Sequence, residues 1–257
     1  MFTIRVDPHV HLYDQYPLEV WYRAALANLG VSPSVFGVVV VVDREGQDSF
    51  GRFRRELSSQ IWEEQIPQPN GPVSRAGVIH TTEQALYVVQ GVQYISAEKI
   101  EVLGLGVQRC CSDGLPCGDL IRRIASEQGI VCLPWSPGKW FGTRGRVVRS
   151  LMDEFSGAGL LFGDISLHTR IVPPSLLLRR AAGLGFTVVR GTDPLPRPCD
   201  ATLVGSYGFG FESCEALNLD NVVERLRVAM SSKTSKLQVW GRPNSIAQAF
   251  SRFISTL

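Results

Sequence analysis

Along the chain, apolar positions recur either with the spacing of a strand or with the spacing of a helix, which predicts strands that alternate with helices. Residues 36–42 form a continuous apolar run rich in valine, which is typical of a strand buried on both faces. Residues 18–29 carry apolar side chains at helical spacing and stop at Gly30, a common helix end. Residues 49–66 predict an amphipathic helix, and the proline-rich stretch 67–72 ends it in a loop.

The same alternation continues through the second half of the chain. Strands that alternate with helices form parallel βαβ units, and about seven such units favour a closed barrel over an open sheet. The predicted helices lie at 120–128, 147–155, 174–182, 221–230 and 245–254, and the predicted strands at 130–133, 160–162 and 187–189.

One segment departs from this alternation. Residues 73–106 contain several short strand candidates with no long helix between them, which predicts a small β-hairpin insertion. The helices of residues 218–257 complete the barrel wall or pair with another subunit. No repeat, linker or low-complexity stretch divides the sequence, so we expect a single domain over 1–257.

Composition narrows the class of protein. The chain is 44% hydrophobic and 19% charged, which is ordinary for a compact protein and excludes a disordered one. The net charge is +2 and no dense lysine–arginine cluster occurs, so we expect no nucleic-acid partner. The six cysteines form no CxxC pair, the sequence begins in a predicted strand, and no apolar run approaches a membrane span. We therefore expect a cytoplasmic protein with no membrane partner.

The most informative motif follows the first apolar run. Asp7-Pro8-His9-Val10-His11 comes directly after residues 2–6, which alternate like a strand. Two histidines spaced i, i+2 on a strand point the same way, and the carboxyl ends of barrel strands are where sites are built. The pair can therefore close on one cation. The alternative is that one histidine caps the strand while the other packs beneath the barrel mouth.

Acidic residues stand at the ends of other predicted strands. Asp43, Glu101, Asp164 and Asp193 all occupy such positions, and these positions converge in a closed barrel. An aspartate after a strand also caps the next helix or forms an Asx turn, so Asp43 and Asp164 have a purely structural alternative.

The order of these motifs resembles the polymerase and histidinol phosphatase (PHP) superfamily. His9-Val10-His11 matches its opening HxH motif, Asp43 matches the acid of its T-D-H turn, and Gly191-Thr192-Asp193 resembles its closing G-S-D-x-H motif. The similarity in order runs over about residues 2–196. It implies a distorted TIM-like (β/α)7 barrel and a metal-dependent phosphoesterase.

The chain also departs from the family pattern. Arg44, Gln93, Trp135 and Leu195 stand where the family would place ligands, and Glu101 stands where it would place a histidine. The resemblance is thus to a divergent member without the family's trinuclear cluster, and we expect one divalent ion of zinc, manganese or iron. The ligands that we predict for it are His9, His11, Glu101, Asp164 and Asp193.

Such a site would hydrolyse its substrate with water activated by the ion, and Asp193 or Glu101 would serve as the general base. The loop 135–146 mixes aromatic, glycine and basic residues at a strand exit, which suits a small anionic metabolite, most naturally a phosphorylated or carboxylated one. The alternative, which we weigh equally with anion binding, is that this loop is a lid held by packed tryptophan side chains, with its basic residues solvated or in salt bridges. The residues that we predict to bind substrate are Arg44, Lys139, Arg144 and Trp135.

Two other functions stay open. An inactive PHP-like barrel would serve as a binding or assembly module, with Arg44 replacing the cation beside the acids. An amidohydrolase-like deaminase or lactonase also begins with HxH and ends with an aspartate, but it needs further histidines or a lysine. Only His80 and His168 are spare, and neither lies at a convincing strand exit. Self-association is also left open.

Overall fold

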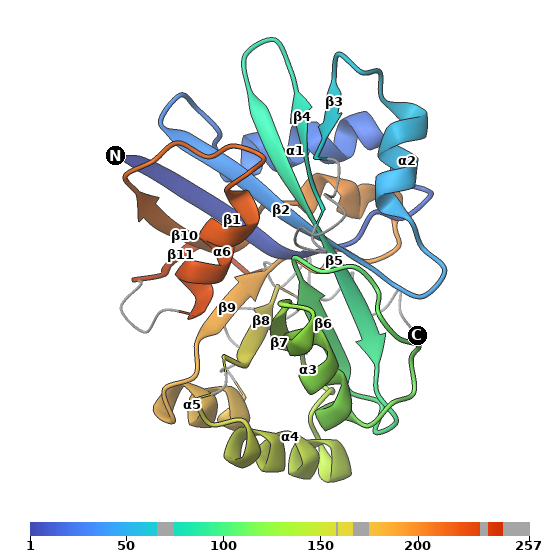
Figure 1. Ribbon diagram of the computed structural model, residues 1–257, viewed down its shortest axis with the longest axis vertical. Coiled ribbons are helices and arrows are strands. Elements are labelled where there is room, and N and C mark those ends of the chain that lie inside the picture. Colours follow the sequence, from blue (N-terminus) through green and yellow to red (C-terminus); the bar gives the residue numbers. More distant parts are fainter. Residues whose placement is uncertain (66–74, 158, 167–174, 232–235, 244–257) are drawn as a thin grey trace.

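The strands of the protein curve into a nearly closed barrel, which confirms the predicted α/β, TIM-like fold (Figure 1). The computed structural model describes residues 1–65, 75–157, 159–166, 175–231 and 236–243. In spatial order the wall consists of β11 (Gln238–Gly241), β10 (Tyr207–Ser213), β1 (Phe2–Val10), β2 (Val35–Asp43), β5 (Ala85–Ile95), β6 (Glu101–Leu105), β7 (Ile130–Trp135), β8 (Leu161–Ile165) and β9 (Val188–Gly191).

Helices cover the outside of this wall and one of its ends. Leu226 and Met230 of α6 belong to the same buried cluster as Val6 and Val38, which point into the barrel, so α6 closes one end. The helices are α1 (Leu18–Leu29), α2 (Ser49–Glu56), α3 (Cys117–Ser126), α4 (Gly142–Glu154), α5 (Leu176–Gly183) and α6 (Val222–Ser231), with a 3₁₀ helix η1 (Pro198–Leu203). None of the helices in the described part of the chain is long and apolar enough to span a membrane.

The wall is distorted because its strands do not all run in parallel. β1, β2 and β5 are parallel neighbours, as are β7, β8 and β9, but β6 runs antiparallel to both β5 and β7. β10 is likewise antiparallel to β1. β5 and β6 fall within 73–106, the range expected for the hairpin insertion, yet both belong to the wall.

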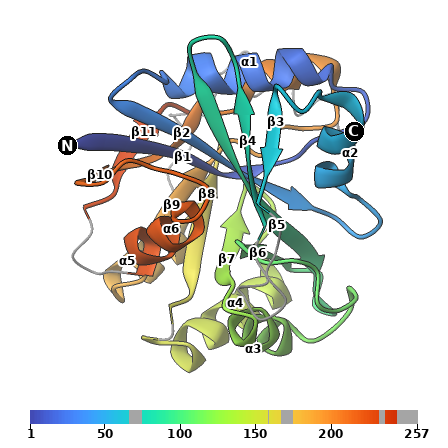
Figure 2. The same cartoon turned by 45° about the horizontal axis from the view of Figure 1, so that its top comes forward.

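The insertion itself consists of β3 (Trp62–Glu64) and β4 (Ala76–His80), which lie off the path of the wall (Figure 2). Their position corrects the helix predicted over 49–66, because α2 ends at Glu56 and Leu57 is extended. Trp62 then pairs with Ile79 across the β3–β4 hairpin. The loop predicted at 67–72 and the helix predicted at 245–254 lie outside the described residues.

A β-bulge in β1 decides which of its side chains face the barrel interior. Val6 belongs to the interior cluster, but the register with β2 shifts between Asp7 and Val10. Val10 consequently packs on the outside, in the cluster that includes α1. Because side chains alternate along a strand, the same shift turns His9 and His11 inward.

Candidate metal centre

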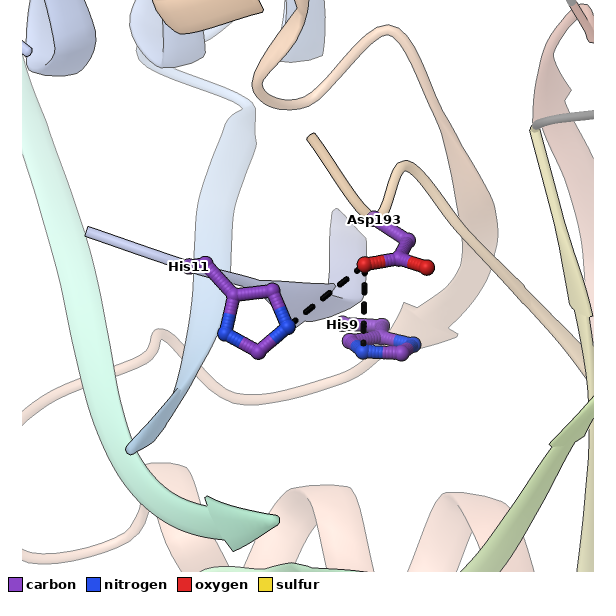
Figure 3. A group of neighbouring side chains, drawn as sticks. All are labelled: His9, His11 and Asp193. Atoms are coloured by element: carbon purple, nitrogen blue, oxygen red, sulfur yellow. Dashed lines mark ion pairs between the residues drawn. The ribbon is translucent and has the colours of Figure 1, made fainter. Parts of the chain in front are cut away.

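Three predicted ligands meet at the carboxyl end of the barrel. The Nε2 atoms of His9 and His11 each lie 3.5 Å from Oδ1 of Asp193, which sits between the two rings (Figure 3). One ligand atom from each residue lies within 4.8 Å of the others. His9 lies in β1, His11 follows directly after its last residue, Val10, and the loop after β9 supplies the aspartate.

Both imidazoles are enclosed by protein. His9 is 2% exposed and His11 is 1% exposed, and none of their four ring nitrogens makes a hydrogen bond of normal geometry among the described residues. Burial lowers the pKa of His9 to about 3, because a charged ring would lose its hydration. His9 is therefore neutral at physiological pH, which is the form that binds a metal ion.

Asp193 complements these neutral rings with a negative charge. Burial by itself raises the pKa of Asp193, but the two imidazoles and the ammonium of Lys139 outweigh burial and hold that pKa well below its usual range. The backbone of Asp193 adopts a left-handed conformation with φ of +46°, which only a few non-glycine residues accept. Such a conformation at a buried carboxylate is typical of functional sites.

Asp7 holds the backbone next to Asp193 in place through hydrogen bonds, a role that the sequence analysis did not assign to it. Its carboxylate accepts hydrogen bonds from the backbone N–H groups of Thr192 and Gly205, both at 2.9 Å, and from the Thr192 hydroxyl. Burial raises the pKa of Asp7 to about 7, against the effect of these donors. Asp7 thus ties β1 to the segment that carries Asp193.

Gln93 is a fourth donor beside the cluster. It lies close enough to His9 to affect the pKa of that ring, and its own Oε1 is buried without a hydrogen-bond partner in the described structure. The set therefore offers two imidazole nitrogens, one carboxylate oxygen and one amide oxygen. Zinc, manganese and iron all accept such mixed ligands, so these residues fit one divalent ion.

Glu101 and Asp164, the other two predicted ligands, stand outside the His9–His11–Asp193 cluster. The Glu101 carboxylate lies 2.5 Å from Nζ of Lys139. Asp164 accepts a hydrogen bond of 3.0 Å from the Tyr207 hydroxyl and lies 4.0 Å from Nε of Arg190. The sequence could not show which partner each acid would meet, because those contacts depend on the tertiary structure.

The predicted substrate-binding residues also differ in how closely they are associated with the cluster. Lys139 is close enough to the centre to affect the pKa values of His9 and Asp193. Arg44 donates to the Tyr13 hydroxyl at 2.6 Å, and Arg144 donates to the Gly138 carbonyl at 3.3 Å. Trp135 packs among outward-facing residues, because its neighbour two positions back, Leu133, also faces outward. Of the four, Lys139 has the strongest link to the centre.

The remaining candidates have structural partners. Asp43 accepts two hydrogen bonds from Ser49 at the start of α2, which agrees with its structural alternative. His80 is exposed on the hairpin and lies 3.2 Å from a carboxylate oxygen of Glu63. His168 lies outside the described residues.

The fold has counterparts among solved structures, although no family model and no curated protein matches the sequence. PsfC from Pseudomonas syringae PB-5123 superposes with a TM-score of 0.58 at 11% identity, covering 100% of both chains. The lesion-specific endonuclease EndoQ from Pyrococcus furiosus gives a TM-score of 0.53 at 10% identity, over 93% of this chain and 58% of that one. Endonuclease Q in complex with a 27-mer duplex that carries an abasic lesion at the active site gives 0.52 at 10% identity, over 92% and 58%.

These neighbours correct one expectation from the sequence. Nucleic acid was excluded because the net charge is small, yet a barrel of this fold acts on a DNA duplex in Endonuclease Q. Overall charge is a poor guide here, because a nucleic-acid enzyme needs positive charge only where the phosphates lie. A small net charge therefore does not exclude a nucleic-acid partner for a protein of this fold, and the expectation based on it is wrong.

Both named neighbours have the PHP fold, and at 10–11% identity the likeness concerns the fold alone. The barrel order, the inward-facing histidine pair at the end of β1 and the aspartate after β9 agree with that likeness. The protein thus has a PHP-like barrel fold, with a buried His–His–Asp cluster at the carboxyl end of its strands.

Proposed function

We propose that this protein is a metal-dependent hydrolase of phosphate esters, with one divalent ion held by His9, His11 and Asp193. The observation that carries the proposal is the convergence of these three buried side chains, whose four ring nitrogens make no hydrogen bond of normal geometry within the described residues. Buried polar atoms normally have partners, and leaving one without costs about 1–3 kcal/mol. A metal ion would satisfy one nitrogen of each ring.

A divalent ion in this position would act as a Lewis acid and lower the pKa of water toward ~7. The chain's own part is to present neutral imidazoles and an ionised carboxylate in a fixed geometry. The hydrogen bond from Asp193 N–H to the His9 carbonyl, at 2.8 Å, and the bonds made by Asp7 supply that rigidity.

Glu101 and Lys139 provide the acid–base and anion-binding groups of the proposal. Because Asp193 is part of the cluster, Glu101 is the carboxylate left to accept a proton from water. Lys139 contacts Glu101, and its positive charge lowers the pKa of Asp193. In the proposal its ammonium would bind an anionic oxygen of a phosphorylated metabolite.

Neither alternative function has comparable support. In the inactive-barrel alternative Arg44 replaces the cation, but its guanidinium contacts Tyr13, and no ion pair joins it to a carboxylate in the described structure. An amidohydrolase would need further histidines near the cluster. His80 is instead on the hairpin beside Glu63.

The decisive experiment measures bound metal by elemental mass spectrometry in protein purified without chelators or a histidine tag. We expect close to one zinc, manganese or iron per chain, and its loss in the double variant His9→Ala/His11→Ala. His80→Ala is the matched control, because it removes an exposed imidazole and should keep the metal. Wild-type protein that stays metal-free after incubation with each ion would rule the proposal out.

Activity is then assayed on p-nitrophenyl phosphate and bis(p-nitrophenyl) phosphate with the metal found. Hydrolysis of either ester that disappears in the double variant supports the proposal. Metal-loaded protein that hydrolyses neither ester would separate metal binding from phosphoester chemistry and refute the latter.

A further inference from the structure

A second concave site lies on the outer side of the barrel, between the loop after β7 and the helices α4 and α5. Its volume is about 630 Å³, within the range of ordinary ligand sites. α4 and α5 lie side by side below the barrel (Figure 1), and Trp135, which faces away from the interior, forms part of the floor. The site is therefore distinct from the His9–His11–Asp193 cluster.

This hollow is strongly basic. Arg146 and Arg149 from α4 and Arg179 and Arg180 from α5 line it, and no acidic residue is among its described lining residues. Arg180 lies 3.7 Å from Asp153, a weak and exposed pair. Arg149 and Arg179 are exposed and form no ion pair within the described part of the chain. The guanidinium groups are thus available to an anionic ligand.

The hollow also has exposed apolar walls. Phe141 is 73% exposed and Leu176 is 77% exposed, whereas large apolar side chains are usually covered. Trp140, beneath them, is packed edge-on against Phe162, so its ring is held rigidly. Phe141 therefore offers a free aromatic face next to the arginines.

We propose that this hollow binds a nucleotide unit, with the base stacked on Phe141 and the phosphate held by the arginines of α4 and α5. A simple inorganic anion would make no use of Phe141 and Leu176, and a purely apolar ligand would make no use of the four arginines. A flat ring that carries a phosphate uses both features. This chemistry is shared by a free nucleotide and by a nucleotide within a single strand.

The loop after β7 connects this site to the candidate metal centre without merging the two. Lys139 contacts Glu101 on the barrel side, whereas Gly138 and Phe141 line the hollow. A nucleotide unit bound here would lie at the same end of the barrel as the cluster. The inference goes beyond the proposed hydrolase activity and holds whether or not that activity exists.

The test measures fluorescence anisotropy of a labelled oligothymidine with full-length protein in low salt and EDTA, with AMP as an unlabelled competitor. The variant Arg149→Glu/Arg179→Glu should weaken binding about tenfold or more. The matched control Arg55→Glu/Arg123→Glu makes the same change in net charge at exposed arginines on α2 and α3, and should weaken binding less than about twofold at matched salt. Phe141→Ala, which removes an exposed ring, should weaken binding several-fold without unfolding the protein.

Competition by AMP would identify a free nucleotide as the ligand, and binding of the oligothymidine alone would identify a strand. Equal losses in the two charge-reversal variants, or no binding of either probe, would overturn the proposal. Because EDTA is present, and because the hollow contains no residue of the His9–His11–Asp193 cluster, failure of the hydrolase proposal would leave this result unaffected.

Discussion

The backbone N–H of Asp193 donates a hydrogen bond of 2.8 Å to the carbonyl of His9, and the side chains of the same two residues approach to 3.5 Å. One contact joins the segment after β9 to β1, and the other forms part of the candidate metal centre. Closure of the barrel and assembly of the centre are therefore the same structural event. Several expected outcomes depend on this relationship.

Asp193→Asn should abolish most metal binding while the protein remains folded. Asparagine accepts the left-handed backbone that Asp193 adopts, but it removes the charge between the two imidazoles. We expect metal affinity to fall by more than the ~10–100-fold that the loss of a supporting hydrogen bond costs. Isothermal titration with zinc or manganese measures this, and Asp43→Asn, at another buried aspartate, is the control. Equal affinities in wild type and Asp193→Asn would remove Asp193 from the ligand set.

Gly191→Ala should displace His9. A β-carbon at Gly191 would lie 2.8 Å from Cβ of His9, closer than carbon atoms pack, so β1 and β9 would have to separate. We expect a loss of about 1–3 kcal/mol in the free energy of unfolding, together with weaker metal binding. Chemical denaturation and metal titration provide the two measurements.

Gly183→Ala is the matched control for that substitution. Its added methyl group, at the end of α5, meets no atom of the described residues within 4 Å, and its φ is not positive. We expect stability to be unchanged or to rise by up to about 1 kcal/mol. A destabilisation as large as that of Gly191→Ala would show that the close approach to His9 is not the cause.

Asp164→Asn should leave metal content unchanged. The Asp164 carboxylate accepts from the Tyr207 hydroxyl and lies near Arg190, so its role in this structure is to join β8, β9 and β10. We expect a loss of about 1 kcal/mol in unfolding free energy, which Tyr207→Phe should reproduce. Elemental analysis of both variants beside wild type checks this, and loss of metal from Asp164→Asn alone would restore Asp164 as a ligand.

Lys139→Met should impair turnover of an anionic ester, because it removes the ammonium that contacts Glu101 and lowers the pKa of Asp193. We expect kcat/KM on p-nitrophenyl phosphate to fall about tenfold or more. Arg144→Met is the control and should change it less than about twofold, since among the described residues Arg144 donates to the Gly138 carbonyl and not to the cluster. If the two variants behave alike, Lys139 has no special role in binding the phosphoryl group.

Much of the secondary structure could be predicted from periodicity alone. The helix at 18–29 and the strand near 36–42 agree with α1 and β2, because each has an apolar pattern of one period and a clear end. The helix predicted over 49–66 was wrong beyond Glu56. The sequence misled because the spacing of Leu57, Ile61 and Trp62 fits either a helix or an extended segment. Pairing of Trp62 with Ile79, a long-range contact, settled that choice.

The sequence by itself determined that His9 and His11 share one side of a strand, because side chains alternate with a period of two. It could not determine that this side faces the barrel interior. Alternation counted from Val6 would turn Val10 inward, and only the bulge between Asp7 and Val10 reverses the phase. Tertiary structure also decided that Asp193 joins the two imidazoles, whereas Glu101 meets Lys139 and Asp164 meets Tyr207. The physical reason is that local sequence sets which side chains point together, while strand register and barrel closure set what they meet.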